Sequence, residues 1–132
     1  MKGLARILLF SVLPLSAMAA ENPLSVHVLD QQRGLPSADM KVRLERRDGE
    51  SWKTLKEDRT DKDGRIRALA PGDALAVGIY RITFETGNWY AGRGQKTLFP
   101  EVPVVIEIDG SAQHYHVPLL LSPYGYSTYR GS

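Results

Sequence analysis

Short stretches with the pattern of β-strands follow one another along the chain, and turn-forming residues separate them. In residues 40–46, apolar side chains alternate with charged ones, as expected for a strand that buries one face. Further strand patterns occupy 24–29, 52–56, 66–69, 79–84, 102–108, 113–121 and 124–129. No long amphipathic helix is apparent. We therefore expect an all-β fold in which about eight short strands form an antiparallel β-sandwich.

The residues between these stretches support the division. Asp48-Gly49 and Asp63-Gly64 are typical of tight turns, and Gly34-Leu35-Pro36 indicates a turn after the first strand. Segment 86–96, with its glycines and bulky aromatic residues, fits a short helix or a loop equally well. A chain of 132 residues is the size of one domain, and without cysteine it has no disulfides, thiol nucleophile or thiolate metal site.

The first twenty residues have the pattern of a secretory signal peptide. Lys2 and Arg6 precede a short apolar stretch at 7–15, and Ala17-Met18-Ala19 offers small residues for cleavage. The apolar stretch is shorter than the roughly 20 residues that a membrane span needs, and no later segment is apolar enough to span. We expect residues 1–20 to be removed and residues 21–132 to form a periplasmic domain.

The charge balance argues against a nucleic-acid partner. The whole chain has a formal net charge of +2, and Lys2 and Arg6 are the only charged residues of the expected leader. Without the leader, basic and acidic residues are equal in number. A neutral chain of this kind does not attract phosphate backbones strongly.

Three histidines are the first candidates for chemistry. His114 and His116 are two residues apart in one strand pattern, so both side chains point to the same face. His27 faces away from Val26 and Val28. If these valines are in the core, His27 points to a surface or an interface. Solvent-exposed histidines without a function fit the same pattern.

Several kinds of site remain open at this point. The three histidines could supply three nitrogen ligands to a zinc ion. Asp61-Lys62-Asp63-Gly64 resembles part of a calcium loop but lacks its closing glutamate, so a turn is expected there. Gly125 to Tyr129 lacks the second glycine of the Gly-x-Ser-x-Gly nucleophile motif. In metal-free hydrolysis, a histidine would take a proton from water and an arginine would stabilise the oxyanion.

Residues 122–132 are unusually rich in tyrosine and hydroxyl groups for the end of a chain. They fit either a last edge strand or a tail that lines a site. Tyr129-Arg130-Gly131-Ser132 resembles the ending of transthyretin-like proteins that are 5-hydroxyisourate hydrolases. Segments 24–30 with 34–36, 59–65, and 114–123 resemble the N-terminal, central and C-terminal motifs of that family, in the same order. The resemblance covers essentially all of residues 21–132.

The resemblance implies the prealbumin-like fold, a sandwich of eight strands with one short helix near 86–94. It implies a homotetramer, a dimer of dimers built by pairing of strand edges, with the active sites at the interface between dimers. It also implies hydrolysis of 5-hydroxyisourate to 2-oxo-4-hydroxy-4-carboxy-5-ureidoimidazoline in urate degradation, without a cofactor or metal.

The resemblance also implies roles for individual residues. The catalytic set would be His27, Arg65, His116 and Ser132, with His27, Arg65 and Tyr129 in contact with substrate. His116 is slightly favoured over His27 as the base, and Arg65 would stabilise negative charge. His114 would support the edge of the site. A carrier function remains the main alternative, because transthyretin itself carries hormone on the same fold and fold alone does not fix function.

Overall fold

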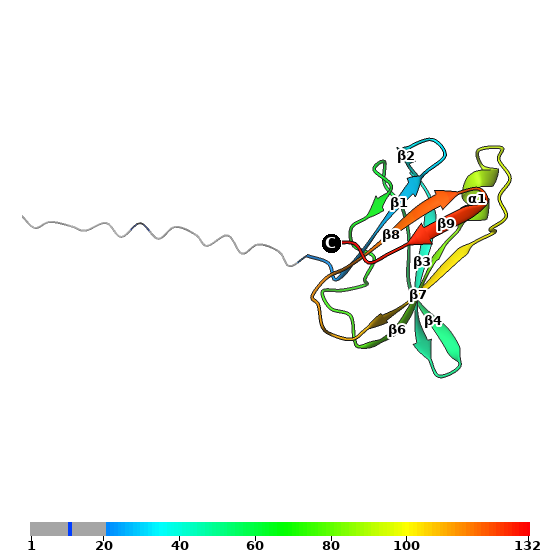
Figure 1. Ribbon diagram of the computed structural model, residues 1–132. Helices are drawn as coiled ribbons and strands as arrows, with labels where there is room; N and C mark the ends of the chain where they lie inside the picture. The colour runs from blue at the N-terminus through cyan, green and yellow to red at the C-terminus, as the bar shows by residue number, and fades with distance from the viewer. Residues whose placement is uncertain (1–10, 12–20) are drawn as a thin grey trace, which may run out of the picture.

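Two β-sheets pack face to face in the computed structural model, which describes residue 11 and residues 21–132 (Figure 1). The first sheet has the order β2 (Leu35–Pro36), β1 (Leu24–Asp30), β8 (Tyr115–Ser122), β9 (Gly125–Thr128), with β5 (Arg65–Ile66) also paired to β1. The second has the order β4 (Ser51–Arg59), β3 (Lys41–Asp48), β6 (Gly78–Phe84), β7 (Val102–Ile108). The predicted all-β sandwich is confirmed. The predicted leader lies outside the described residues, apart from residue 11.

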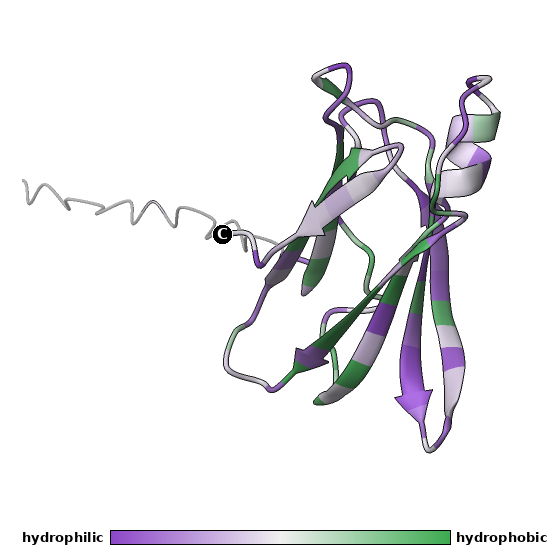
Figure 2. Ribbon diagram, turned by 45° about the vertical axis from the view of Figure 1, so that its right-hand side comes forward, coloured by the Kyte–Doolittle hydropathy of each residue, from purple (hydrophilic) through white to green (hydrophobic). Residues whose placement is uncertain are grey.

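The core fills the space between the sheets, and the strands alternate in polarity along their length (Figure 2). Val26 and Val28 of β1 and Val42 and Leu44 of β3 are fully buried. The predicted Asp48-Gly49 hairpin is also present, because Asp48 pairs with Ser51 across a tight turn. The period of two that was read from the sequence therefore places the apolar side chains inside.

Three local details differ from the sequence patterns. The sandwich is predominantly antiparallel, as expected, but β1 and β8 run parallel. Their direction is not set by a hairpin, because about 90 residues, including the whole second sheet, separate them in sequence. The strand expected at 66–69 is reduced to β5 at Arg65–Ile66, and the buried Leu69 and Ala70 lie in the irregular segment that follows it. The predicted turn after β1 is present and includes Gly34, but Leu35–Pro36 already belong to the strand β2, which pairs with the end of β1.

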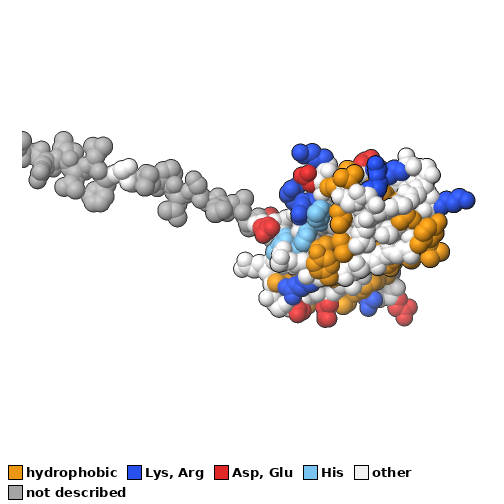
Figure 3. All heavy atoms as spheres, turned by 45° about the horizontal axis from the view of Figure 1, so that its top comes forward, with side chains coloured by type: hydrophobic (Ala, Val, Ile, Leu, Met, Phe, Trp, Pro, Cys, Tyr) orange, Lys and Arg blue, Asp and Glu red, His pale blue; other side chains and the backbone are white. Residues whose placement is uncertain are grey.

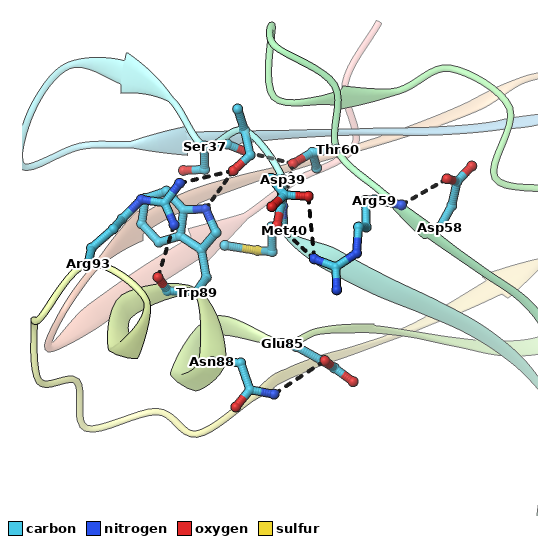
Figure 4. Close-up of polar contacts among 11 residues, drawn as sticks. Ser37, Asp39, Met40, Asp58, Arg59, Thr60, Glu85, Asn88, Trp89 and Arg93 are labelled. Atoms are coloured by element: carbon cyan, nitrogen blue, oxygen red, sulfur yellow. Dashed lines mark hydrogen bonds and ion pairs between the residues drawn. The ribbon is translucent and has the colours of Figure 1, made fainter.

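The helix α1 (Thr86–Ala91) occupies the segment that sequence pattern alone could not assign. It confirms the short helix implied by the family resemblance. Figure 4 shows how α1 is attached: the indole Nε1 of Trp89 donates to the Ala38 carbonyl at 2.8 Å, and the Arg93 guanidinium stacks on the Trp89 ring at 3.7 Å. A helix this short shows too little periodicity to be read from sequence. In the described part of the chain, no helix is long and apolar enough to cross a membrane.

Candidate active site on the outer face of the first sheet

Strand β1 is the centre of the candidate site. Because Val26 and Val28 point into the core, Ser25 and His27 point outward. His27 is paired with Arg65 of β5, and Ser25 is paired with His116 of β8. Paired residues share a face of the sheet, so side chains from three adjacent strands meet on the outer surface. Histidine side chains gather there beside basic side chains (Figure 3).

A tight turn presents Arg65 beside β1. The Asp61 carboxylate accepts hydrogen bonds from the backbone N–H groups of Asp63 at 2.8 Å and Arg65 at 3.0 Å. The hydrogen bond from Arg65 is the main cause that lowers the pKa of Asp61. Gly64 has a φ of +73°, and a Cβ there would lie 2.5 Å from the Val28 carbonyl oxygen. The predicted turn is therefore present, and its glycine lets β5 lie close against β1.

A chain of hydrogen bonds runs from the backbone to the ring of His116. His116 Nδ1 lies 2.7 Å from the Ser25 hydroxyl, which lies 3.1 Å from His114 Nε2. His114 Nδ1 lies 2.6 Å from the carbonyl oxygen of Asn22. Sequence reasoning missed Ser25. Its position two residues before His27 on one strand was the available signal, since it places both side chains on the same face.

The surroundings of His27 and His116 favour the neutral forms of both rings. Burial lowers the pKa of His116, and the positive charge of Arg65 lowers it further, followed by His27 and His114; the Ser25 backbone acts in the opposite direction. Burial also lowers the pKa of His27, with a further contribution from Arg65 that is partly opposed by the backbone of Asp63. Neutral imidazoles can accept a proton from water, while arginine keeps its charge.

The tail passes directly against His116. The backbone N–H of Gly131 donates to the His116 carbonyl at 2.8 Å. A Cβ at Gly131 would clash with Cδ2 of the imidazole and lie 3.2 Å from its Cγ, so a larger residue cannot approach in this way. The predicted site residue Ser132 follows, exposed, next to this contact.

The other predicted tail residue, Tyr129, lies in a different hollow from Arg65. Tyr129 is exposed and lines a cavity of about 370 Å³ together with His116, between β7 and the tail. Arg65 lines a hollow of about 470 Å³ together with Ser25 and Asn22. A single chain therefore brings Arg65, His27 and His116 onto one face but does not place Tyr129 in the same hollow as Arg65.

The other kinds of site considered from sequence fit the geometry less well. Among residues 21–132, no three His, Cys, Asp or Glu side chains are placed to hold a metal ion. Both His114 and His116 direct a ring nitrogen at Ser25. Gly125–Thr128 forms the extended strand β9, which differs from the sharp strand-to-helix turn of a serine nucleophile.

The family model described as "HIUase/Transthyretin family" matches residues 24–131. The chain belongs to this family. Among HIUase/transthyretin proteins, it is 52% identical over 120 residues to the 5-hydroxyisourate hydrolase of Salmonella dublin, covering 90% of this chain and 88% of that protein. It is 50% identical over 113 residues to that of Caulobacter vibrioides, covering 83% and 97% of the two chains.

Solved structures of the HIUase/transthyretin family have the same fold. The 5-hydroxyisourate hydrolase of Klebsiella pneumoniae matches with a TM-score of 0.76 at 37% identity, covering 84% of this chain and 99% of that one. Sea bream transthyretin in complex with thyroxine matches with a TM-score of 0.77 at 27% identity, covering 83% and 94%. Backbone similarity alone does not separate the two functions, so the site residues must do so.

Proposed function

We propose that this protein is a 5-hydroxyisourate hydrolase of urate degradation, which opens the cyclic amide of its substrate to give 2-oxo-4-hydroxy-4-carboxy-5-ureidoimidazoline without a cofactor. The proposal is carried by the arrangement of Arg65, His27 and His116 on one sheet face, in a chain 52% identical over most of its length to a hydrolase of that name. A neutral imidazole can take a proton from water and a permanent cation can stabilise the oxyanion, and these are the two functions that metal-free amide hydrolysis needs.

The reaction divides between these groups. His116 takes a proton from water as the water oxygen bonds to the amide carbonyl carbon. Arg65 donates hydrogen bonds to the oxygen that becomes negative. When the carbonyl re-forms, the ring C–N bond breaks and the proton passes to the leaving nitrogen. His27, paired with Arg65, binds substrate and is the second candidate for the base.

The tail residues have supporting roles in this proposal. Ser132 orients water and Tyr129 contacts the substrate ring through hydrogen bonds. Both residues are exposed beside His116, so their reach towards Arg65 depends on the assembled protein.

The proposed assembly is a homotetramer formed as a dimer of dimers. β7 and β9 each lie at the edge of a sheet, with one side unpaired among the described strands. Val105 on β7 and Tyr126 on β9 are large apolar side chains that stay exposed in the single chain. Unpaired edges of this kind are commonly covered by another copy. From the leader pattern, the proposed location is the periplasm.

The direct test is hydrolysis of freshly generated 5-hydroxyisourate, followed by loss of its near-ultraviolet absorbance. Purified residues 21–132 should accelerate the decay well above the rate in buffer, and equal rates would reject the proposed function. Thyroxine binding without acceleration would favour a carrier instead. Activity lost in chelator and restored by zinc would favour the metal alternative.

A further inference from the structure

We propose that His114 and Ser25 are positioning residues that fix the tautomer of His116, so that Nδ1 carries the proton and Nε2 is free to accept one. The inference rests on the proposed function, because it explains how the base is prepared for its reaction. It follows from which atoms along the hydrogen-bond chain are able to donate and which can only accept.

The chain starts at an atom that cannot donate. The Asn22 carbonyl oxygen lies 2.6 Å from His114 Nδ1, so this nitrogen must carry the proton. The position of Asn22 is well fixed, because its side-chain Oδ1 accepts hydrogen bonds from the backbone N–H groups of Leu24 at 3.1 Å and Ala70 at 3.2 Å. In the neutral ring of His114, Nε2 is then an acceptor.

Ser25 passes this constraint to the second ring. A hydroxyl has one proton to donate and lone pairs with which to accept. Because His114 Nε2 is an acceptor 3.1 Å away, the Ser25 hydroxyl donates to it. The Ser25 oxygen must then accept from His116 Nδ1 at 2.7 Å.

The result is a defined state of the base. With the proton on Nδ1, the neutral ring of His116 has its lone pair on Nε2, which can take a proton from water. Free histidine in water favours the opposite tautomer, with the proton on Nε2. The Nδ1–H form at His116 is therefore a specific consequence of the contacts with Ser25 and His114. Ser25 is nearly buried, so water does not readily replace it.

The tautomer can be read directly from two-bond ¹H–¹⁵N correlation spectra of the imidazole rings at pH 7.5. The protein has only three histidines, and a His27→Gln variant assigns the signals of His27. A His116→Gln variant, which removes the His116 signals, separates them from those of His114. We expect the Nδ1–H form of His116 in the unsubstituted protein. In Ser25→Ala, the Nε2–H form should predominate, and turnover should fall by roughly 10- to 100-fold, the usual effect of losing a group that orients a catalytic residue.

Two further variants separate positioning from general damage. Ser25→Thr keeps the hydroxyl and should restore both the Nδ1–H form and most of the turnover. Thr54→Ala removes an exposed hydroxyl from β4 of the other sheet and should change neither. If Ser25→Ala does not fold, His114→Asn gives the same readout, because the shorter amide keeps the Asn22 contact and frees Ser25 to donate to His116.

An Nε2–H form of His116 in the unsubstituted protein would overturn the proposal, as would an unchanged Nδ1–H form in the folded Ser25→Ala and His114→Asn variants. Failure of the proposed function gives a different result. In that case the tautomers follow the expected pattern, but the unsubstituted protein does not accelerate 5-hydroxyisourate decay.

Discussion

Gly131 lets the tail touch the ring of His116, and its lack of a side chain is what makes the contact possible. Gly131→Ala should push the imidazole aside and lower kcat/KM by roughly 10²-fold, as expected when a catalytic group moves by about 1 Å. Gly125→Ala is the matched control in the same segment, because a Cβ there meets no atom within 4 Å. Steady-state kinetics of both variants test the prediction, and equal activities would contradict it.

Arg65 supplies the positive charge of the proposed site. Arg65→Ala should leave a folded protein whose kcat/KM is lower by roughly 10²-fold or more, which is the usual cost of removing a group that stabilises an oxyanion. Arg65→Lys keeps the charge but loses the planar fork of donors. Its kcat/KM should lie between that of Arg65→Ala and that of the unsubstituted protein. Arg47→Ala, on β3 of the second sheet, is the control. Near-normal turnover of Arg65→Ala would remove this residue from the mechanism.

His27 and His116 should also make stability depend on pH. Their pKa values in the folded protein lie below the ordinary 6.5, chiefly because of burial. As pH falls below about 6.5, the unfolded chain binds protons that the folded protein does not, so the free energy of unfolding decreases. Above that pH, both states hold neutral histidines and the effect is absent.

Urea denaturation at pH 7.5, 6.5 and 5.5 measures this effect. The midpoint should fall over the lower interval in the unsubstituted protein and fall less in a His27→Gln/His116→Gln variant. Asp109 contributes to the pH dependence of stability in a separate, more acidic pH range. Hydrogen bonds from Ser111, then from Tyr115, lower its pKa to about 2. Its contribution is present above its ordinary pKa of 3.8 and is lost only as pH falls towards 2. An equal fall for both proteins between pH 6.5 and 5.5 would contradict the assignment to histidine.

At the level of elements, the turn before β5 determines where Arg65 lies. Gly64→Ala should cost about 1–2 kcal/mol for an alanine at positive φ and a further 1–3 kcal/mol or so for overpacking against Val28. Gly49 has a similar φ, +60°, but a Cβ there would meet nothing within 4 Å. Gly49→Ala should therefore cost only about 1–2 kcal/mol, the cost of an alanine at positive φ. Denaturation midpoints compare the two, and equal losses would show that the close approach is unimportant.

How much could be predicted from sequence differs between elements for a physical reason. The hairpin of β3 and β4 was predictable because one local turn sets the pairing of Asp48 with Ser51. The parallel pairing of β1 with β8 was not, because it joins segments about 90 residues apart through the packing of the whole fold. The role of Ser25 depends on that pairing. The inward and outward faces were predictable, but the partners of the outward residues were not.

At the level of the whole molecule, the open sheet edges should control assembly. Val105→Asp places a charge on the exposed edge strand β7 and should lower the mass measured by light scattering below that of the proposed tetramer. Val77→Asp is the matched control, because Val77 is similarly exposed but lies in a loop before β6. An unsubstituted protein that is monomeric, or a Val105→Asp variant that remains tetrameric, would argue against pairing through this edge.

Inward and outward side chains alternate along β1, so one face of the strand packs in the core and the other face forms part of the proposed site. Val26 and Val28 hold the sandwich together, while Ser25 and His27 are free of that task. Outward residues can therefore be exchanged during evolution without disturbing the core. This explains how a hydrolase and a thyroxine-binding transthyretin can both superimpose on this chain almost equally well, with TM-scores of 0.76 and 0.77. One backbone can acquire a new chemistry through a few surface positions, at little risk to its folding.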